Sequence, residues 1–251
     1  MPDKDSRNYI YGIHTSNAQL KLNPNDIKKI FIKKNSQNKQ LKKIISISSQ
    51  HNIPLEEVEK DFLTTLSFSN KHQGVVCELN NLSLSNFNLD TYLQIHKSPF
   101  IVIFDSIQDP RNLGSCIRTA NAAGVSLIIK KKANSCEISP LVHKAASGGL
   151  QGLSLLETNN LSSIIKKLKN NNITIIGTDH VASKSIYEMK KISSGIAVII
   201  GSEGDGISKS LLNICDEIYK VPIHGSVDCL NVSVATGIVL YQAYLSIKKI
   251  K

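Results

Sequence analysis

The chain has 251 residues, of which 41% are hydrophobic and 20% charged, a composition typical of a folded globular protein with one or two domains. No apolar run approaches the roughly 18 residues that span a membrane, and the polar start MPDKDSRNY argues against a signal or transit peptide, so we expect a cytoplasmic protein with no membrane segment. Five scattered cysteines form no CxxC pair, which argues against disulfides and against a zinc or other metal site.

The net charge of +10 favours nucleic acid as a partner, because a basic protein is attracted to a phosphate backbone. This argument is weak by itself, since 27 of the 30 basic residues are lysines and many can be solvated surface. The three arginines, Arg7, Arg111 and Arg118, are more informative. In a chain that uses lysine nearly everywhere, an arginine indicates a position that needs a planar donor of several hydrogen bonds.

Residues 1–76 form the first predicted domain, in which helix-like and strand-like patterns alternate within a small unit. From Ile27 to Leu55 the sequence holds seven lysines and no acidic residue. We expect one cationic face there, although a lysine run alone is more often solvated surface. The Asn- and Ser-rich stretch that follows, residues 77–92, is predicted to be a linker.

Residues 93–251 form the second predicted domain, where short apolar runs alternate with helix-like segments. The runs FIVIFD, VSLIIK, ITIIGT and IAVIIG are continuous and rich in β-branched residues, as in strands that are buried on both faces. The alternation predicts an α/β domain with a mostly parallel sheet. The carboxyl edge of such a sheet is the usual ligand site.

The first segment that carries chemistry is DSIQDPRNLGSCIRTANAAGV, residues 105–125. We expect a strand to end at Asp105 and a helix to run to Gly124, with Asn112 as its N-cap. Arg118 then lies in the middle of this helix. Asn112 can be a plain cap and Arg118 part of a surface ion pair, but both follow a turn at the ligand edge of the sheet, which favours a functional role.

The second segment is VIIGSEGDGISKS, residues 198–210, in which a buried strand ends at a glycine-rich, acidic turn. Gly201 and Gly206 are spaced as in a phosphate-binding loop, but Lys209 does not follow the second glycine directly, and the acidic residues of the turn would repel a polyphosphate. The missing Cβ of Gly201 lets a ligand lie against the main chain. An ordinary tight turn before a helix near Ser208 also explains the pattern.

The third segment is KVPIHGSVDCLNVSVATGIVLYQAYL, residues 220–245, which predicts a short strand, an irregular loop and a helix from about Leu230 and Asn231. Asn231 can simply cap this helix. Apolar residues surround more of the helix than one core face requires, which predicts a second buried face against another subunit. These residues are Val232, Val234, Ile238, Val239 and Tyr241.

Together the three segments resemble the SpoU branch of the SPOUT methyltransferases. The family's first motif is matched by Asn112, Gly114, Arg118 and Ala120, the second by Gly201, Glu203, Gly204 and Gly206, and the third by LNVSVA at residues 230–235. The N-terminal IYGIHTSNAQL and the HQG at residues 72–74 extend the resemblance over nearly the whole length, and favour the members of the branch that act on 23S rRNA.

The resemblance implies an α/β fold with a C-terminal SPOUT domain, which has a deep trefoil knot, and a small N-terminal α/β/α domain that binds RNA. It implies S-adenosylmethionine as the cofactor and 2′-O-ribose methylation of a guanosine in 23S rRNA as the reaction. This cofactor has a sulfonium cation and no phosphate, so it suits an acidic turn. The implied partners are 23S rRNA, or a ribosomal assembly intermediate, and a second copy of the chain in a homodimer.

Roles for single residues also follow from the resemblance. The implied catalytic residues are Asn112, Arg118, Glu203 and Asn231. The implied cofactor-binding residues are Thr178, Gly201, Val221, Ile223 and Leu230. Alternatives are a tRNA ribose 2′-O-methyltransferase of the same family, a non-catalytic RNA-binding protein of ribosome assembly, and an NTPase, which the displaced lysine disfavours.

Overall fold

The structure is a computed structural model that describes residues 9–67, 69–80 and 87–247. The chain forms two compact units, one from residues 1–83 with 138–152 and the other from residues 84–137 with 153–251. Arg7 and residues 81–86 of the expected linker lie outside the described residues. None of the described helices is long and apolar enough to cross a membrane.

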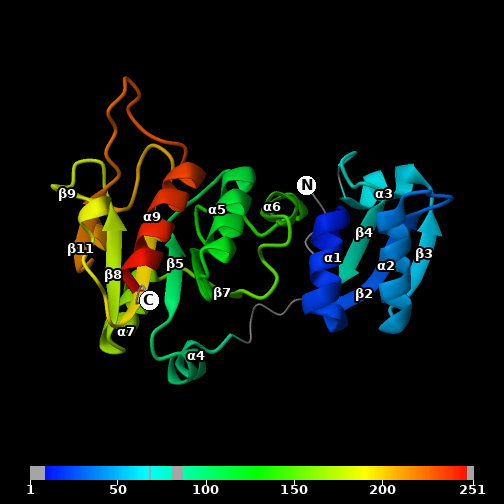
Figure 1. Ribbon diagram of the computed structural model, residues 1–251, viewed down its shortest axis with the longest axis horizontal. Helices are drawn as coiled ribbons and strands as arrows, with labels where there is room; N and C mark the ends of the chain where they lie inside the picture. Colours follow the sequence, from blue (N-terminus) through cyan, green and yellow to red (C-terminus); the bar gives the residue numbers. More distant parts are fainter. Residues whose placement is uncertain (1–8, 68, 81–86, 248–251) are drawn as a thin grey trace. The chain divides into compact units, whose positions relative to one another are not determined.

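The first unit contains a four-stranded mixed sheet in the order β1-β4-β2-β3 (Figure 1). Strands β2 and β3 are parallel, whereas β4 runs antiparallel to β1 and β2. The strands are β1 (Tyr9–Tyr11), β2 (Ile27–Lys33), β3 (Leu55–Val58) and β4 (Val75–Leu79). The helices are α1 (Ile13–Leu22), the short 3-10 helix η2 (Pro24–Asp26), α2 (Lys39–Gln50), α3 (Lys60–Ser67) and α6 (Pro140–Ala146).

Alternation of side chains along β2 and β4 gives this sheet a core on each face. On one face Ile30 and Cys77 pack in a cluster with Leu41 of α2. On the other face Phe31 and Val76, the residue before Cys77 on β4, pack in a cluster with α3. The sheet therefore has helices on both faces, which confirms the α/β/α domain that the resemblance implied.

Helix α6 packs against β1 and α1 within the first unit. From the sequence we expected every residue from 93 onward in the second domain. The periodicity of a short helix such as α6 does not reveal which sheet it covers. A side-chain hydrogen bond between two buried residues joins the segment to α1, with Gln151 Nε2 donating to Gln19 Oε1 at 3.0 Å.

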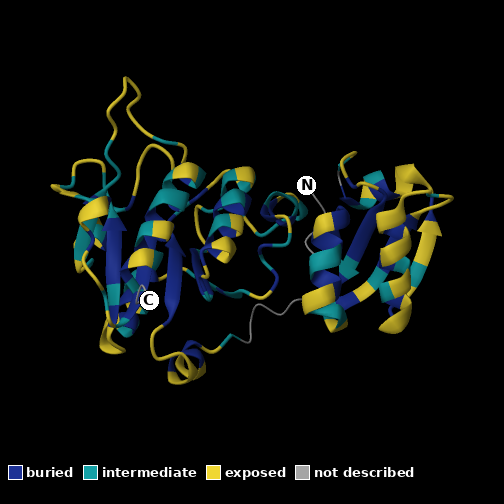
Figure 2. Cartoon of the chain, viewed as in Figure 1, coloured by how far each residue is buried: buried dark blue, intermediate teal, exposed yellow. Residues whose placement is uncertain are grey.

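The second unit contains a seven-stranded sheet in the order β7-β6-β5-β10-β8-β11-β9, and every paired strand in it is parallel. Strands β5 and β10 are buried along their whole length (Figure 2). The apolar runs identified in the sequence form β5, β6, β8 and β10, which confirms the mostly parallel α/β domain. The strands are β5 (Phe100–Phe104), β6 (Leu127–Lys131), β7 (Ser154–Thr158), β8 (Ile173–Thr178), β9 (Lys184–Ser185), β10 (Gly195–Ile200) and β11 (Glu217–Lys220).

Helices complete the second unit. Residues of α4, α7 and α8 share one core cluster with β5 and β8. Helices α5 and α9 pack against each other, and α9 also lies on β10. The helices are α4 (Leu89–Ile95), α5 (Pro110–Ala122), α7 (Leu161–Asn170), the short 3-10 helix η4 (Ile186–Glu188), α8 (Lys209–Leu212) and α9 (Val232–Ile247).

The strand order locates the ligand edge of this sheet. From β5 the chain adds β6 and β7 on one side, whereas β8 lies on the other side and β10 is inserted between β5 and β8. A reversal of this kind leaves a crevice at the carboxyl ends of the strands, where ligands of open α/β sheets bind. The trefoil knot that the resemblance implies stays a prediction.

The histidine of α6 provides a test of its packing. His143 is 6% exposed, and burial lowers its pKa from 6.5 to about 4. The unfolded chain binds the proton more readily, so the stability that neutral His143 contributes is full above pH 6.5 and is lost as the pH falls toward 4. We expect His143→Gln to remove up to about 3 kcal/mol of the loss in unfolding free energy between pH 7 and pH 4.

Urea unfolding at a series of pH values measures this loss, with His14→Gln, a change at an exposed histidine of α1, as the control. An unchanged pH dependence in the His143 variant would show that α6 does not bury its histidine in the folded protein.

Candidate functional site

Three adjacent strands bring the expected cofactor-binding residues to one edge of the seven-stranded sheet. Thr178 ends β8, Gly201 directly follows β10, and the Thr178 hydroxyl donates to the carbonyl of Ile199 at 3.4 Å. β11 pairs with β8, and the loop that leaves it carries Val221, Ile223 and Leu230. The carboxyl ends of these strands therefore lie side by side, with the implied cofactor residues on the turns that follow them.

The glycine-rich turn after β10 closes tightly on itself. The Ser202 N–H donates to the Gly206 carbonyl at 3.0 Å, and the Gly206 N–H donates back at 3.2 Å. A Cβ on Gly201 would lie 2.1 Å from the carbonyl carbon of Gly206. The turn's own backbone thus fills the space that we expected a ligand to use, and Gly201 is required for closure of the turn. Glu203 lies exposed within the turn.

Glu203 joins the three motif segments. Its Oε1 accepts a hydrogen bond from Asn112 Nδ2 at 2.7 Å and another from Asn231 Nδ2 at 3.2 Å. Asn231 Nδ2 also lies 3.2 Å from Asn112 Oδ1. Asn231 Oδ1 accepts the Ser233 N–H at 2.9 Å, so this side chain caps α9 and contacts the other motifs at the same time. We call Asn112, Glu203 and Asn231 the amide–carboxylate cluster.

The N-cap of α5 is Asp109, and the expectation that Asn112 has this position is wrong. Asp109 Oδ1 accepts the N–H groups of Arg111 at 2.8 Å and of Asn112 at 2.9 Å, and Pro110 occupies the first turn. Because a neighbouring carboxylate caps the helix, the Asn112 amide is available to bind Glu203.

Arg118 does not join the cluster. It is exposed on α5, six residues after Asn112, a rise of about 9 Å along the helix. It makes no hydrogen bond or ion pair with any residue that the structure describes. Helix α5 itself is fixed against α9, where Cys116 Sγ lies 3.3 Å from the Thr236 hydroxyl. Arg118 is therefore a cation without a partner among the described residues, on a helix whose position is fixed.

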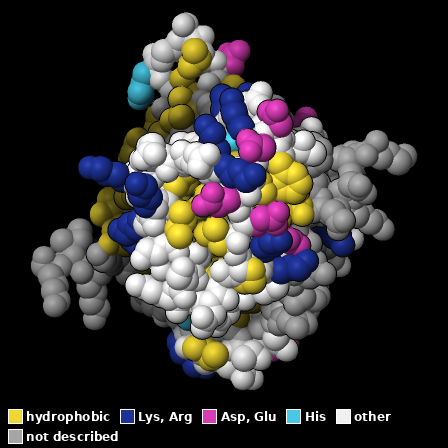
Figure 3. Space-filling model, turned by 90° about the vertical axis from the view of Figure 1, so that its right-hand side faces the viewer, with side chains coloured by type: hydrophobic (Ala, Val, Ile, Leu, Met, Phe, Trp, Pro, Cys, Tyr) yellow, Lys and Arg dark blue, Asp and Glu magenta, His cyan; other side chains and the backbone are white. Residues whose placement is uncertain are grey.

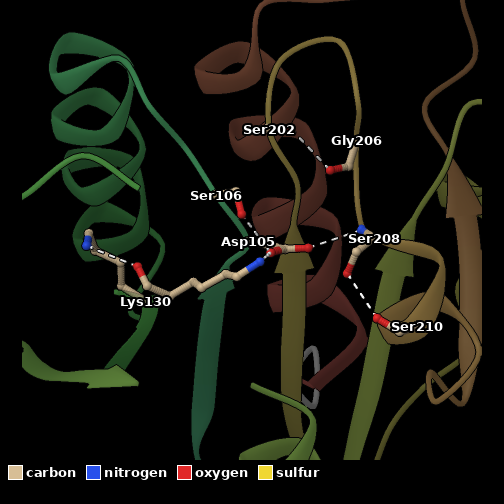
Figure 4. A network of polar contacts seen from close by, with 8 residues as sticks. Asp105, Ser106, Lys130, Ser202, Gly206, Ser208 and Ser210 are labelled. Atoms are coloured by element: carbon tan, nitrogen blue, oxygen red, sulfur yellow. Dashed lines mark hydrogen bonds and ion pairs between the residues drawn. The ribbon is translucent and has the colours of Figure 1, made fainter. Parts of the chain in front are cut away.

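Asp105, which we expected only as a strand end, anchors the base of the turn (Figure 4). Asp105 is 2% exposed, and its side chain accepts the Ser208 N–H at 3.1 Å, the Ser106 hydroxyl at 3.1 Å and the Lys131 ammonium at 3.4 Å. Burial would raise the pKa of Asp105, but hydrogen bonds from Ser208, the charge of Lys131 and the Ser106 hydroxyl outweigh burial and hold that pKa below 3.8. A carboxylate that directly follows an apolar strand was the signal for this role.

The chemistry of the site follows from these groups. Glu203 and Asp205 are exposed in the turn and make its surface acidic, which suits a cationic ligand rather than a phosphate. The amides of Asn112 and Asn231 lie beside this surface and can orient a hydroxyl. No cluster of three or more His, Cys, Asp or Glu side chains suited to a metal ion occurs in the described part of the chain.

A single methyl group tests the closure of the turn. Gly201→Ala places its Cβ against backbone atoms that cannot move alone, so we expect a loss of about 1–3 kcal/mol in unfolding free energy. Exchange of the Ser202 and Gly206 amide hydrogens should also become faster. Gly225→Ala is the matched control, because a Cβ at Gly225 meets no atom within 4 Å. Equal stability of the two variants would contradict the tight turn.

Comparison with known proteins identifies the family of the chain. The model of the SpoU rRNA Methylase family matches residues 99–241, and a model described as RNA 2'-O ribose methyltransferase substrate binding matches residues 9–84. The 23S rRNA (guanosine-2'-O-)-methyltransferase RlmB of Vibrio vulnificus is 34% identical over 239 residues, a match that covers 95% of this chain and 96% of that protein. The protein of the same name from Escherichia coli K12 is 33% identical over 235 residues, or 93% of this chain and 96% of its own.

Among solved structures, the SpoU methyltransferase AviRb from Streptomyces viridochromogenes, in complex with the cofactor AdoMet, superposes with a TM-score of 0.77. Its sequence identity is 19%, and the match covers 94% of this chain and 89% of AviRb, so the likeness is one of fold. The family match, the full-length relatives and the shared fold lead to one conclusion. The chain belongs to the SpoU rRNA Methylase family.

Proposed function

We propose that this chain transfers a methyl group from S-adenosylmethionine to the ribose 2′-hydroxyl of a guanosine in 23S rRNA, in the cytoplasm where that RNA is made. Relatives at 33–34% identity carry the name of this activity, and residues 9–84 match a substrate-binding family model. The observation that carries the proposal is that Glu203 binds both Asn112 and Asn231, because these bonds gather three distant segments at one sheet edge.

The edge of the sheet fits the cofactor, and AviRb binds AdoMet with the same fold. When bound, S-adenosylmethionine supplies an electrophilic methyl group on a sulfonium cation. The exposed carboxylates of Glu203 and Asp205 favour that cation over a phosphate. Ile223 and Val227, in the loop after β11, are 36% and 59% exposed and offer an apolar surface for a purine. Main chain at Val221 and Leu230, with the Thr178 hydroxyl, would hold the rest, while Gly201 keeps the turn beside them closed.

The protein's contribution to the reaction is mainly positioning. The 2′-hydroxyl must lie in line with the methyl carbon–sulfur bond of the cofactor, which breaks in the reaction. Alignment of this kind lowers the activation barrier by roughly 7–11 kcal/mol. Asn112 and Asn231 orient the ribose, since Glu203 holds both of their amides. Arg118 binds the ribose-phosphate and stabilises the developing alkoxide through the paired N–H donors of its planar guanidinium, here called the fork. It is not the base, because a guanidinium stays protonated in proteins.

The hydroxyl proton goes to Glu203. Both amide hydrogen bonds of this side chain end on Oε1, and no described residue donates to Oε2. Oε2 is therefore the oxygen that can accept the proton, while Oε1 keeps the carboxylate in place. A nearby carboxylate of this kind is a suitable general base once the substrate lies within hydrogen-bond reach.

Substitution of the arginine separates its fork from its charge. Arg118→Lys keeps the charge but not the planar pair of donors, so we expect the single-turnover rate of methyl transfer to fall by about 100-fold. Arg111→Lys, a change at an exposed arginine in the first turn of the same helix, should have little effect. Full activity of the Arg118 variant would rule out a need for the fork.

We further propose that the chain acts as a homodimer through α9. Val234, Tyr241 and Leu245 lie on one face of this helix and are 52%, 49% and 49% exposed. Val232 and Val239, two of the apolar residues that we expected around this helix, are 7% and 1% exposed and pack within the subunit. An apolar stripe that the subunit leaves uncovered suits a self-complementary contact.

The stripe gives a direct test of assembly. Tyr241→Glu should convert the dimer to a monomer in analytical ultracentrifugation, whereas Leu22→Glu, at an exposed apolar residue of the first unit, should not. A wild-type protein that sediments as a monomer at high concentration would contradict the proposal.

Ligand binding and product mapping test the proposed function itself. We expect calorimetry to show binding of S-adenosylmethionine and not of ATP. In a transfer assay, the methyl group should appear on one ribose of a 23S rRNA transcript and not on bulk tRNA. Methylation of tRNA alone would favour the tRNA branch of the family, binding without transfer would favour an assembly factor, and binding of ATP alone would favour an NTPase.

A further inference from the structure

A pocket of about 290 Å³ opens on the first unit, outside the proposed methyl-transfer site. It lies where the end of β2, the start of α2, the start of α3 and the turn before β4 meet. Its volume is close to the lower limit of small-molecule sites, about 300 Å³, and larger than a bare phosphate needs. Residues that line it include Lys33, Asn38, Lys60, Asn70, His72 and Gly74.

The pocket has positive charge that no described residue neutralises through an ion pair. Lys33 and Lys60 form no ion pair within the described residues, whereas Lys34, the residue after β2, pairs with Glu59 at 3.7 Å. Elsewhere on this unit lysines lie beside acidic side chains (Figure 3). No acidic residue of the described chain lines the pocket. An anionic ligand would supply the missing charge.

The polar groups of the pocket are arranged as donors. Asn38 Oδ1 already accepts the Gln40 N–H at 2.8 Å, and Asn70 Oδ1 accepts the Thr64 hydroxyl at 3.3 Å. The Nδ2 groups of both amides remain to donate, as do the two ammonium groups. A ligand rich in acceptors, such as a phosphate with its sugar and base oxygens, matches this set.

A buried histidine forms a fixed wall. His72 is 2% exposed, its Nδ1 accepts the Gly74 N–H at 3.0 Å, and its Nε2 lies 3.4 Å from the Thr64 hydroxyl. Burial, then the charges of Lys60 and Lys33, lower the pKa of His72. Burial and these charges therefore favour the neutral form of the ring.

The turn that carries this histidine is rigid, so the pocket is formed before a ligand arrives. Gln73 and Gly74 are both left-handed, with φ of 57° and 85°. The Gln73 side chain accepts the Ile13 N–H at the start of α1 at 3.0 Å. A Cβ on Gly74 would lie 2.9 Å from Leu41 Cδ1. The HQG motif thus shapes the floor of the pocket and holds it to α1 and α2.

A second pocket, of about 330 Å³ in the other unit, has both signs of charge in its lining, with Lys190 and Lys191 beside two acidic residues. Its lining includes Lys184 and Glu217, which pair at 2.5 Å, and also Glu188. Volume alone therefore does not mark the first pocket as an anion site. The first pocket differs because its lining has lysines and amide donors but no acidic residue.

We propose that the pocket of the first unit holds one nucleotide of the RNA substrate, with its phosphate between Lys33 and Lys60 and its sugar or base edge at the amides of Asn38 and Asn70. This inference rests on the proposed function and extends it, because it gives the first unit a defined RNA contact. The pocket would hold RNA at a point distant in sequence from the residues that perform methyl transfer.

Two charge-matched double variants test the pocket. Lys33→Ala/Lys60→Ala should weaken binding of an unmodified 23S rRNA transcript by about tenfold or more at 0.1 M salt. Lys42→Ala/Lys43→Ala removes the same charge from exposed positions of α2 outside the pocket and should weaken binding by only about two- to threefold. Circular dichroism and urea unfolding check that both variants fold. Equal losses in the two variants would overturn the proposal.

An isosteric variant tests it without loss of a side chain. Asn70→Asp keeps the acceptor for Thr64 and puts a negative charge in the pocket, so RNA affinity should fall about tenfold, while Asn25→Asp, at an exposed residue of η2, should change it little. If wild type methylates RNA but the pocket variants match their controls, the pocket is refuted and the function stands. If RNA affinity depends on the pocket but no methyl group is transferred, the pocket stands and the function fails. A wild type that binds no RNA overturns both.

Discussion

The site depends on one carboxylate that accepts two amides. Asn112 and Asn231 are 119 residues apart, and Glu203 lies between them in sequence. Their side chains meet because Glu203 Oε1 binds both. Each asparagine is also held by its own helix, so the three hydrogen bonds fix the relative position of α5, the glycine turn and α9. A hydroxyl that binds this cluster would be oriented by all three segments.

The cluster needs a rigid support, and the sheet edge supplies it. The turn that presents Glu203 is closed by paired hydrogen bonds between Ser202 and Gly206, and its exit is tied to the end of β5 through Asp105 and Ser208. Buried strands on both sides leave this edge little freedom to move. The glycine spacing of this acidic turn resembles that of a phosphate-binding loop. In the structure the turn instead holds the Glu203 carboxylate in place. The site's binding chemistry and its local folding use the same residues.

Much of this arrangement could be predicted from the sequence. Strands buried on both faces have continuous apolar sequences, so β5 and β10 could be predicted as strands. The motifs identified the members of the amide–carboxylate cluster. The sequence alone could not show which residue is the N-cap of α5, because Asp109 and Asn112 both suit that position. The residues that contact Asp105 and α6 could not be predicted either, because tertiary structure determines these contacts and local sequence patterns do not show them. The sequence also left open which apolar residues of α9 stay uncovered, because the rotation of the helix decides which valines enter the core.

The most direct test of the central claim is a double-mutant cycle on the two amides. Asn112→Ala, Asn231→Ala and the double variant would be compared by kcat/KM for methyl transfer to 23S rRNA, with circular dichroism to check folding. Because the shared carboxylate couples the two side chains, we predict a loss in the double variant that is smaller than the sum of the single losses by about 1 kcal/mol or more. Losses that simply add would show that the asparagines act independently and would contradict the cluster as the organising interaction.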